Sequence, residues 1–488
     1  MSETPSADTT SAATPGINRL NKLARVLAGA EHGLPLTRLG GRVSEVAPSH
    51  IKVSGLAAGA ELGSFVEVEC GDKCILGEVI GIQEHSTTVK LYSSAPKLGL
   101  GCRAWIREEL AIKPDQSWLG RVINAIGQPI DGKEPLHDGN AIYPIDRDPL
   151  APMSLKRVRE PVATGVRAVD LFSPICAGQR IGVFAGSGVG KSTLVSMLTR
   201  SSSFKTIVVA LVAERSREVR EFIEDVIEPS SARAVTVVAT SSESAMMRKL
   251  AAKTAMTVAE YFRDRGDDVL LIVDSVTRYA HALREVALAA GEPPVARGYA
   301  PSVFAELPRL LERAGPGTAA TGSITGVFSV LVDGDDHNDP VADTVRGILD
   351  GHIVLDRNIA DQGRYPAINP LTSISRLASH VWSAEEATLV RRLRALISNF
   401  EDTRELRVLG AYKPGSDADL DQAVALTPML YRFLTQLPGD QPSTKVFDEL
   451  AAALAQLRSQ EESQSGEAKS ARPPPPSQRG LAQHATRR

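Results

Sequence analysis

The sequence has little of what secreted, membrane-spanning or nucleic-acid-binding proteins carry. Only 4 of its 488 residues are cysteines, so we expect reduced thiols in a cytosolic protein and no zinc site. No apolar run approaches the roughly 18 residues needed to span a bilayer, and residues 1–16 lack the charged start and apolar core of a signal peptide. The net charge is -3, which gives no global basic field for nucleic acid. Any membrane contact is therefore expected to be peripheral.

The length suggests about three domains, since domains average roughly 150 residues, and a short segment precedes them. Residues 1–16 are rich in Ser, Thr, Ala and Pro and are expected to be disordered. Residues 17–30 predict an amphipathic helix with Arg19, Lys22 and Arg25 on its basic side. We assign residues 1–35 to this start and to a helix that docks on a partner. Packing on its own domain and contact with an anionic membrane surface are the alternatives.

Residues 36–108 consist of six short β-type runs separated by glycine. Strands at such spacing predict a small closed barrel, which leaves no strand edge exposed. Small barrels often bind nucleic acid through aromatic and basic residues. Only Phe65, Tyr92 and Trp105 are available here, and acidic residues are mixed in. A structural role is therefore favoured, and no nucleic acid is expected.

Residues 109–383 predict an α/β domain. It begins with a connector at 118–132 that is rich in turn residues. Apolar strands are expected at 180–184, 206–212, 234–239, 269–273 and 323–332, with helices at 216–227, 242–264 and 279–289. This alternation predicts a parallel sheet covered by helices on both faces. Ligands of such sheets bind at the carboxyl ends of the strands.

Helical periodicity returns at 384–400, 420–437 and 446–457 and predicts a helical C-terminal domain over 384–458. Residues 459–488 are polar, include a proline run at 473–476 and are expected to be a disordered tail. The predicted fold class is thus α/β, with an N-terminal β-barrel and a C-terminal helical domain.

The strongest functional signal lies in residues 180–200, where an apolar strand runs into a turn of small residues and then into a helix. Without Cβ atoms at Gly186, Gly188 and Gly190, the N–H groups of the turn can point inward at an anion, and the helix N-terminus strengthens their attraction. The pattern is G-x-x-x-x-G-K-[ST], except that Ala185 stands first, where a methyl group still permits the turn. The expected nucleotide-binding residues are Ala185, Gly186, Ser187, Gly188, Val189, Gly190, Lys191, Ser192 and Thr193.

The chemistry of this loop predicts ATP and Mg²⁺ as ligands. Lys191 is expected to reach the β- and γ-phosphates, and the Ser192 hydroxyl is expected to ligate Mg²⁺. Asp274 closes the apolar run 269–273, so its carboxylate is the second expected Mg²⁺ group, directly or through water. A strand-end aspartate that caps a turn is the alternative.

Glu214 closes the other apolar run, which begins at residue 207. A carboxylate at this strand end is suited to hold and polarise the water that attacks the γ-phosphate. Glu218 and Glu221 fall inside the following helix and are expected to be solvated or ion-paired. Glu214 is therefore the predicted catalytic carboxylate.

Positive charge must offset the charge that accumulates on the transferred phosphoryl group. Arg215 is the candidate beside Glu214. Arg376 is a candidate arginine finger that reaches a neighbouring molecule's nucleotide, with a surface ion pair as the alternative. Tyr365 is a candidate for stacking on adenine, with a core aromatic as the alternative.

Taken together, these segments resemble the catalytic subunits of rotary ATP synthases and their relatives in bacterial protein export. The resemblance covers about residues 115–435. It is carried by GSGVGKST, LVAERSREVREFIED, VLLIVDSVTRY, LPRLLERAG, GDDHNDP, GRYPAI and SISR in this order. The Glu-Arg pair with the LPRLLERAG and GDDHNDP stretches is most similar to the flagellar protein-export ATPases, also called flagellum-specific ATP synthases.

The resemblance implies a RecA-like P-loop ATPase domain and a homohexamer with nucleotides between subunits. It implies phosphate and Mg²⁺ roles for Lys191, Ser192 and Asp274, the catalytic role for Glu214, and the finger role for Arg376. Tyr365 falls at the family's adenine-stacking tyrosine. Ala213 stands where relatives usually have glycine, so a methyl group is expected to slow the chemistry without removing it. The tail after residue 459 is not covered.

The resemblance further implies partners. The basic helix at 17–30 would dock a stator-like regulator, and the C-terminal domain would face the membrane proteins of the export gate and chaperoned cargo. Three alternatives stay open: the ATPase of a non-flagellar type III secretion injectisome, an RNA translocase like the Rho termination factor, and a non-catalytic nucleotide-binding ring subunit. Glu214 argues against the last, because such a subunit needs no catalytic carboxylate.

Overall fold

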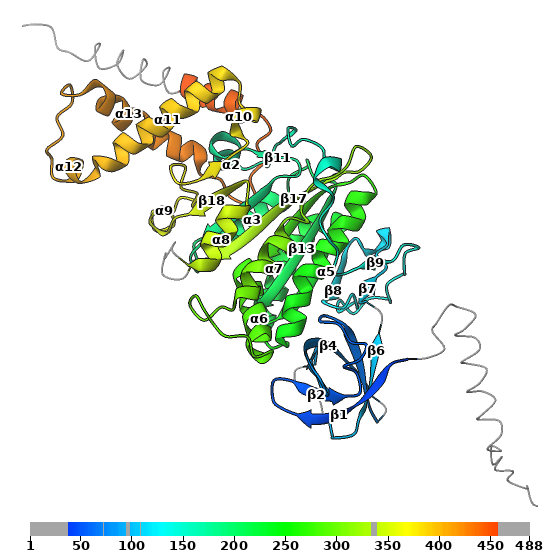
Figure 1. The fold of residues 1–488 in the computed structure, drawn as a ribbon. Coiled ribbons are helices and arrows are strands. Elements are labelled where there is room, and N and C mark those ends of the chain that lie inside the picture. The colour runs from blue at the N-terminus through cyan, green and yellow to red at the C-terminus, as the bar shows by residue number, and fades with distance from the viewer. Residues whose placement is uncertain (1–37, 72, 94–97, 108, 333–338, 457–488) are drawn as a thin grey trace, which may run out of the picture.

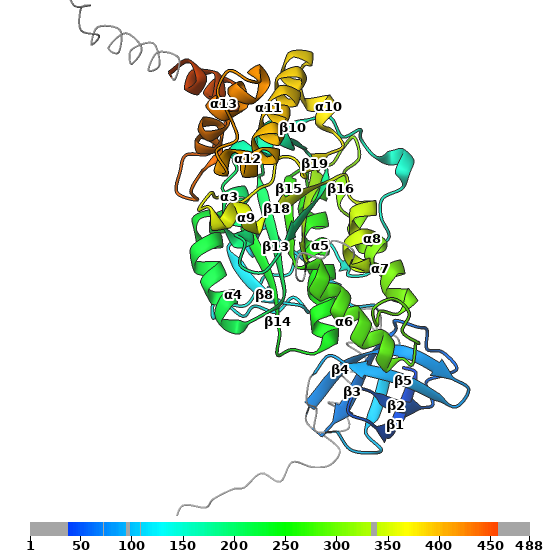
Figure 2. The same cartoon turned by 90° about the vertical axis from the view of Figure 1, so that its left-hand side faces the viewer.

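The computed structural model describes residues 38–71, 73–93, 98–107, 109–332 and 339–456. The β-barrel lies at one end of the molecule, the α/β domain in the middle and the C-terminal helices at the other end (Figures 1 and 2). The predicted helix over 17–30 and the tail over 459–488 lie outside the described residues.

The first domain is a closed barrel of six antiparallel strands in the order β1-β2-β5-β4-β3-β6. The strands are β1 (Gly40–Val46), β2 (Ile51–Ser54), β3 (Phe65–Cys70), β4 (Lys73–Gln83), β5 (Ser86–Leu91) and β6 (Arg103–Arg107). Alternate apolar side chains such as Val53, Val66 and Val89 fill its interior and are fully buried. The predicted six-stranded barrel is confirmed.

The central sheet contains all five predicted strands. They are β12 (Arg180–Ala185), β13 (Thr206–Glu214), β14 (Ala234–Thr240), β15 (Asp268–Asp274) and β17 (Ser323–Leu331), which pair in parallel in the order β12-β17-β15-β13-β14. Sequence periodicity missed β18 (Gly351–Leu355), which extends the sheet beside β12. Five residues between turns are too few to show a period.

The prediction for 118–132 as a connector alone was wrong in one respect. Within it, β8 (Arg121–Asn124) pairs in parallel with β14 and becomes an edge strand of the central sheet. Only four residues make up this strand, and Gly127 and Gly132 follow it at φ 81° and 70°, so turn residues dominate the local pattern. The predicted turn is present. Its turn residues masked the sequence pattern of the short strand that precedes it.

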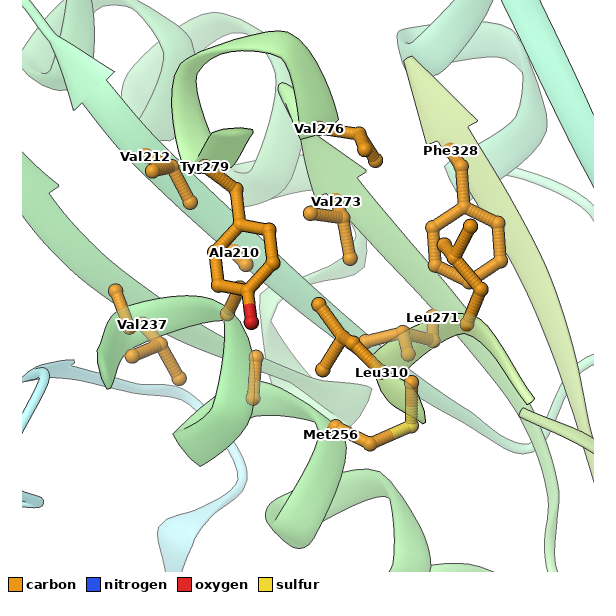
Figure 3. Packing of buried hydrophobic residues seen from close by; sticks show 14 of the residues in the cluster. Ala210, Val212, Val237, Met256, Leu271, Val273, Val276, Tyr279, Leu310 and Phe328 are labelled. Carbon is orange, nitrogen blue, oxygen red and sulfur yellow. The ribbon is translucent and has the colours of Figure 1, made fainter. Parts of the chain in front are cut away.

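Helices cover both faces of the sheet, as predicted. Along β13, Val208, Ala210 and Val212 pack toward the face covered by α5 (Ala245–Asp264) and α6 (Val276–Ala289). Figure 3 shows Ala210 and Val212 in this cluster, near Tyr279 of α6. Ile207, Val209 and Leu211 pack toward the face that bears α3 (Lys191–Thr199) and α4 (Ser216–Phe222). The unpredicted α7 (Pro301–Leu311) and α8 (Pro340–Ile348) contribute to the first face. This two-sided burial explains the continuously apolar strands.

The C-terminal domain is built from α11 (Ala384–Asp402), α12 (Arg404–Val408), α13 (Ala418–Leu434) and a helix at 446–456. Leu171 and Phe172 of α2 (Arg167–Phe172) insert into its apolar core and join it to the α/β domain. Within the described part of the chain, no helix combines the length and apolar character needed to cross a membrane.

The remaining elements are short. They are β7 (Ala111–Ile112), β9 (Tyr143–Pro144), β10 (Pro161–Val162), β11 (Ile175–Cys176), β16 (Gly315–Pro316), β19 (Ile374–Ser375), α9 (Arg357–Asp361), α10 (Ala378–Val381), the 3-10 turns Gln116–Trp118, Pro152–Ser154 and Glu228–Arg233, and the π turn Ile223–Ile227.

Candidate nucleotide-binding site

The predicted phosphate loop connects the carboxyl end of β12 to the N-terminus of α3. Gly188 and Gly190 adopt φ values of 76° and 100°, which disfavour any residue with a Cβ atom. Gly190 is the N-cap of α3, so the helix begins at Lys191. Val189 is buried, whereas Ser187 and Gly188 are exposed at the tip. The loop thus presents backbone N–H groups and a helix N-terminus to one side of the sheet, as an anion site requires.

The loop forms one wall of a cleft of ≈ 670 Å³. Glu214, Arg215, Asp274 and Arg278 line the cleft together with loop residues from Gly186 to Thr193. A volume of this size is typical of sites for small-molecule ligands. Three strand ends that are far apart in sequence therefore meet at one cavity.

Lys191 and Asp274 are joined by an ion pair across the cleft floor. The Asp274 side chain is only 4% exposed, and the Ser329 hydroxyl donates a hydrogen bond of 2.7 Å to its Oδ1. Asp274 thus lies beside the loop, as its position at the end of β15 predicted. The Ser192 side chain is exposed at the first turn of α3. A hydroxyl and a carboxylate at the phosphate loop fit Mg²⁺, which takes oxygen ligands and keeps several waters.

Glu214 occupies the other wall because of an irregularity in β13. The pairing of β13 with β14 shifts register between Val212 and Glu214. Ala213, between them, adopts φ 57°, in the left-handed region that residues with a Cβ atom seldom enter. Such a bulge redirects the side chain that follows it. The Glu214 carboxylate lines the cleft with its side chain 13% exposed.

The electrostatic environment of Glu214 raises the pKa of its carboxyl to about 7. Burial is the main cause, and the negative charge of Asp274 adds to it. The positive charges of Lys191 and Arg278 act in the opposite direction. A carboxylate with a pKa near neutrality is suited to accept a proton from water.

Sequence reasoning missed Arg278, which the structure brings into this site. It lies in the first turn of α6, four residues after Asp274. Its Nη2 lies 3.4 Å from Oε2 of Glu214, and its Nη1 donates a hydrogen bond to the Ala213 carbonyl. The sequence did contain one signal for Arg278. A helix that begins directly after a strand-end aspartate places its first turn at the same edge of the sheet.

Two predicted arginines lie away from the cleft floor. Arg215 lines the cleft, but its side chain is 77% exposed and pairs with Glu218 at 3.2 Å. Glu221 pairs with Arg217, so both glutamates are ion-paired, one of the two outcomes predicted for them, and both also line the cleft. Arg376 is exposed and does not line the cleft of its own chain.

Tyr365 packs against the phosphate loop. A Cβ atom at Gly190 would lie 3.1 Å from Cε1 of the Tyr365 ring. The segment that carries this tyrosine makes a second contact with the loop, because Arg357 Nη2 donates to the Ser187 carbonyl at 3.0 Å. Sequence reasoning did not single out Arg357.

The matches to known protein families agree with this geometry. Residues 165–375 match the nucleotide-binding domain of the ATP synthase alpha/beta family, and residues 382–456 match the type III secretion EscN ATPase C-terminal domain. The chain is 52% identical to the flagellum-specific ATP synthase of Agrobacterium fabrum, over 91% of this chain and 93% of that relative. The chain belongs to the flagellum-specific ATP synthase family. The family is one of ATP-hydrolysing enzymes, and the resemblance inferred from the motifs is confirmed.

Solved structures agree with this family fold. The assembled ATPase EscN of the enteropathogenic E. coli type III secretion system matches with a TM-score of 0.79 and 37% identity, over 85% of this chain and 99% of that chain. The assembled EscN in complex with its central stalk EscO matches with a TM-score of 0.76, the same identity and the same coverage. A flagellum-specific ATP synthase of this kind thus shares its barrel, sheet and C-terminal helices with a secretion ATPase.

Proposed function

We propose that this protein is the ATP-hydrolysing motor of a bacterial flagellar type III protein export apparatus. It would couple hydrolysis of Mg-ATP at subunit interfaces to export, or to chaperone release, of flagellar proteins. The observation that supports this most is the convergence of Lys191, Glu214 and Asp274 on one cleft. Membership in the flagellum-specific ATP synthase family supplies the cellular process.

The residues of the cleft support a specific division of roles. N–H groups of the loop and the Lys191 ammonium bind the phosphates, while Ser192 and Asp274 hold Mg²⁺. The ion, when bound, neutralises charge on the phosphate oxygens. Glu214 accepts the proton of the attacking water, which it orients toward the γ-phosphate. Tyr365 stacks on adenine beside Gly190.

Positive charge around the transferred group comes from three arginines in this proposal. Arg278 faces the cleft directly, and Arg215 swings in from its exposed pair with Glu218. Arg376 acts on the nucleotide of the adjoining subunit, which fits its exposure outside the cleft of its own chain. An arginine finger of this kind stabilises charge that develops only in the transition state.

The proposed assembly is a homohexamer. EscN was solved in assembled form and with a central stalk, and this chain has EscN's domains in EscN's order. We propose a stator-like regulator at the helix predicted over 17–30, and gate membrane proteins with chaperone-bound cargo at the C-terminal domain. The working location is then the cytoplasm at the flagellar base, with peripheral contact to the inner membrane.

An injectisome ATPase is the nearest alternative, because the C-terminal match and the EscN structures come from type III secretion. Identity favours the flagellar system, at 52% against 42% for a type 3 secretion system ATPase. An RNA translocase is disfavoured by the barrel. Phe65 and Tyr92 stack on each other with ring centroids 5.9 Å apart, and Trp105 packs against Gly40, so these rings are engaged within the protein.

The test combines an assay of ATP hydrolysis by the purified protein with an assay of motility and secretion in cells. Purified full-length chain should hydrolyse Mg-ATP, and Lys191→Ala should abolish turnover because the β- and γ-phosphates lose their cation. In cells, deletion of the gene should stop swimming and the secretion of flagellar hook protein, and only the wild-type gene should restore both. Normal swimming with lost secretion of needle proteins would contradict the flagellar assignment and favour the injectisome. Turnover that depends on added RNA would contradict both.

A further inference from the structure

The segment that carries Tyr365 touches the phosphate loop on one side and the C-terminal helical domain on the other. On the loop side, the Tyr365 ring packs on Gly190 and Arg357 bonds to the Ser187 carbonyl. On the other side, the backbone N–H of Gln436 donates to the Tyr365 carbonyl at 2.7 Å. This short stretch of chain is therefore one of the contacts between the two domains, and it adjoins the phosphate loop.

Arg364 supplies the side-chain part of the contact with the helical domain. Its guanidinium carbon lies 3.7 Å from the ring centroid of Tyr431, on α13. The Arg364 Nε makes no hydrogen bond to any described residue, so the stacking contact is a main restraint on this side chain. The Tyr431 hydroxyl donates a hydrogen bond to Glu401. The Tyr431 ring also makes an edge-on contact with the Phe400 ring, with the two ring centroids 6.0 Å apart.

We propose that Arg364, stacked on Tyr431, is a positioning residue that holds the neighbouring Tyr365 against the phosphate loop and thereby sets the affinity for nucleotide. The inference rests on the proposed function, since it presumes that the cleft binds ATP. It adds that the helical domain contributes to nucleotide affinity without touching the nucleotide.

The physical basis is the short covalent distance between the two residues. Arg364 and Tyr365 are consecutive, so the backbone at 364 cannot shift without moving the ring that rests on Gly190. A stacked guanidinium resists such a shift, and it acts beside the Gln436 hydrogen bond and the apolar packing of Leu434 on the same side. A stack of this kind contributes enough to change a binding constant by about threefold to tenfold. A displacement of α13 by a partner would act on nucleotide affinity through the same contact.

The experiment uses the full chain and two readouts. One is the dissociation constant of a fluorescent N-methylanthraniloyl ADP with Mg²⁺, and the other is the pair KM and kcat for ATP. Arg364→Gln and Tyr431→Leu should each weaken nucleotide binding and raise KM by about threefold to tenfold, with kcat at saturating ATP changed less than KM. Because each removes the same stack, the double variant should be no weaker than either single variant.

Two matched variants separate positioning from general damage. Tyr431→Phe keeps the ring under Arg364 and removes the hydroxyl, whose main partner is Glu401, so its affinity should stay closer to that of the wild type than that of Tyr431→Leu. Arg407→Gln removes a similar stack in the same domain, where the guanidinium carbon lies 3.5 Å from the Phe400 ring centroid. This arginine is not in the Tyr365 segment and acts on Tyr431 only indirectly, through Phe400, so its loss should raise KM much less than the loss of Arg364. A thermal melt of each variant checks the fold.

The inference is overturned if Arg364→Gln binds nucleotide as the wild type does, if Arg407→Gln weakens binding equally, or if the two single effects add. A wild-type chain that binds no nucleotide would instead overturn the proposed function itself. The two failures are thus distinguishable, because the wild-type dissociation constant is measured first. If Tyr431→Leu does not fold, the comparison of Arg364→Gln with Arg407→Gln still decides.

Discussion

The guanidinium of Arg278 lies 3.4 Å from the carboxylate of Glu214, so the first turn of α6 is tied to the end of β13 across the cleft. Its other terminal nitrogen donates to the carbonyl of Ala213, the residue before this glutamate. One arginine therefore fixes both the backbone bulge and the side chain that the bulge directs. Its positive charge also favours the ionised form of the carboxyl group.

The first prediction concerns pH. Burial raises the pKa of Glu214 to about 7, and Arg278 opposes this rise. A base must be ionised to act, so kcat/KM for ATP should fall as the pH drops below about 7. Arg278→Gln removes a positive charge, so the pKa of Glu214 should rise and the acid limb should move to higher pH. The measurement is kcat/KM across roughly pH 5.5 to 8.5, which is about 1.5 on either side of the pKa on which such profiles report.

Arg220→Gln is the control for that profile, since Arg220 is exposed and pairs with Glu224, and neither residue lines the cleft. It should leave the midpoint unchanged. An acid limb that stays in place in Arg278→Gln would show that the guanidinium has no influence on the ionisation of the base.

The second prediction separates binding from chemistry. Glu214→Gln keeps the size of the side chain and its place beside Arg278 but cannot accept a proton. Turnover should fall by about a hundredfold to ten-thousandfold, the usual contribution of a positioned base, while nucleotide affinity should stay within about twofold of the wild type. Glu224→Gln, in the turn after α4, removes an exposed carboxylate that does not line the cleft and should retain activity. Loss of binding in Glu214→Gln would mean that the residue is structural.

Much of the site could be predicted because it sits where parallel strands end. An apolar run that closes on a charged residue marks a strand end, and in a parallel sheet all carboxyl ends share one edge. Strand-end reasoning predicts that Glu214 and Asp274 lie beside the phosphate loop of Lys191, and the sheet register brings all three to one cleft. The order of the strands was not needed for this step.

Arg278 and the strand β8 are features that such reasoning cannot predict. A charged residue in the first turn of a helix is ordinary, and only the pairing of β13 with β15 reveals that this turn faces Glu214. In β8, four residues cannot display a period of two against the strong turn residues that follow. Both depend on contacts between segments more than 60 residues apart, which a local pattern does not contain.

The third prediction tests whether the active site is shared between chains. Arg376→Ala and Lys191→Ala should each lose turnover when assembled alone. In a mixture, some interfaces combine the intact loop of an Arg376→Ala subunit with the intact arginine of a Lys191→Ala subunit. These interfaces should recover a fraction of wild-type activity, measured as ATP turnover against mixing ratio.

A matched mixture provides the control. Lys191→Ala and Glu214→Gln both damage the same side of an interface, because the loop and the carboxylate line one cleft within one chain. Their mixture should stay inactive at every ratio. If the Arg376→Ala mixture also stays inactive, the finger does not act between subunits.

The last prediction concerns Ala213, whose φ of 57° places a methyl group in a left-handed conformation. That conformation costs roughly 1 to 2 kcal/mol for a residue with a Cβ atom and nothing for glycine. Ala213→Gly should therefore be less destabilising than Ala210→Gly, at another buried alanine of the same strand, by about 1 to 2 kcal/mol in unfolding experiments. Since Ala213 aims Glu214 at the cleft, Ala213→Gly should also turn over ATP at least as fast as the wild type. Equal destabilisation by the two substitutions would show that the bulge stores no strain, and slower turnover would show that the methyl group helps to hold the carboxylate in place.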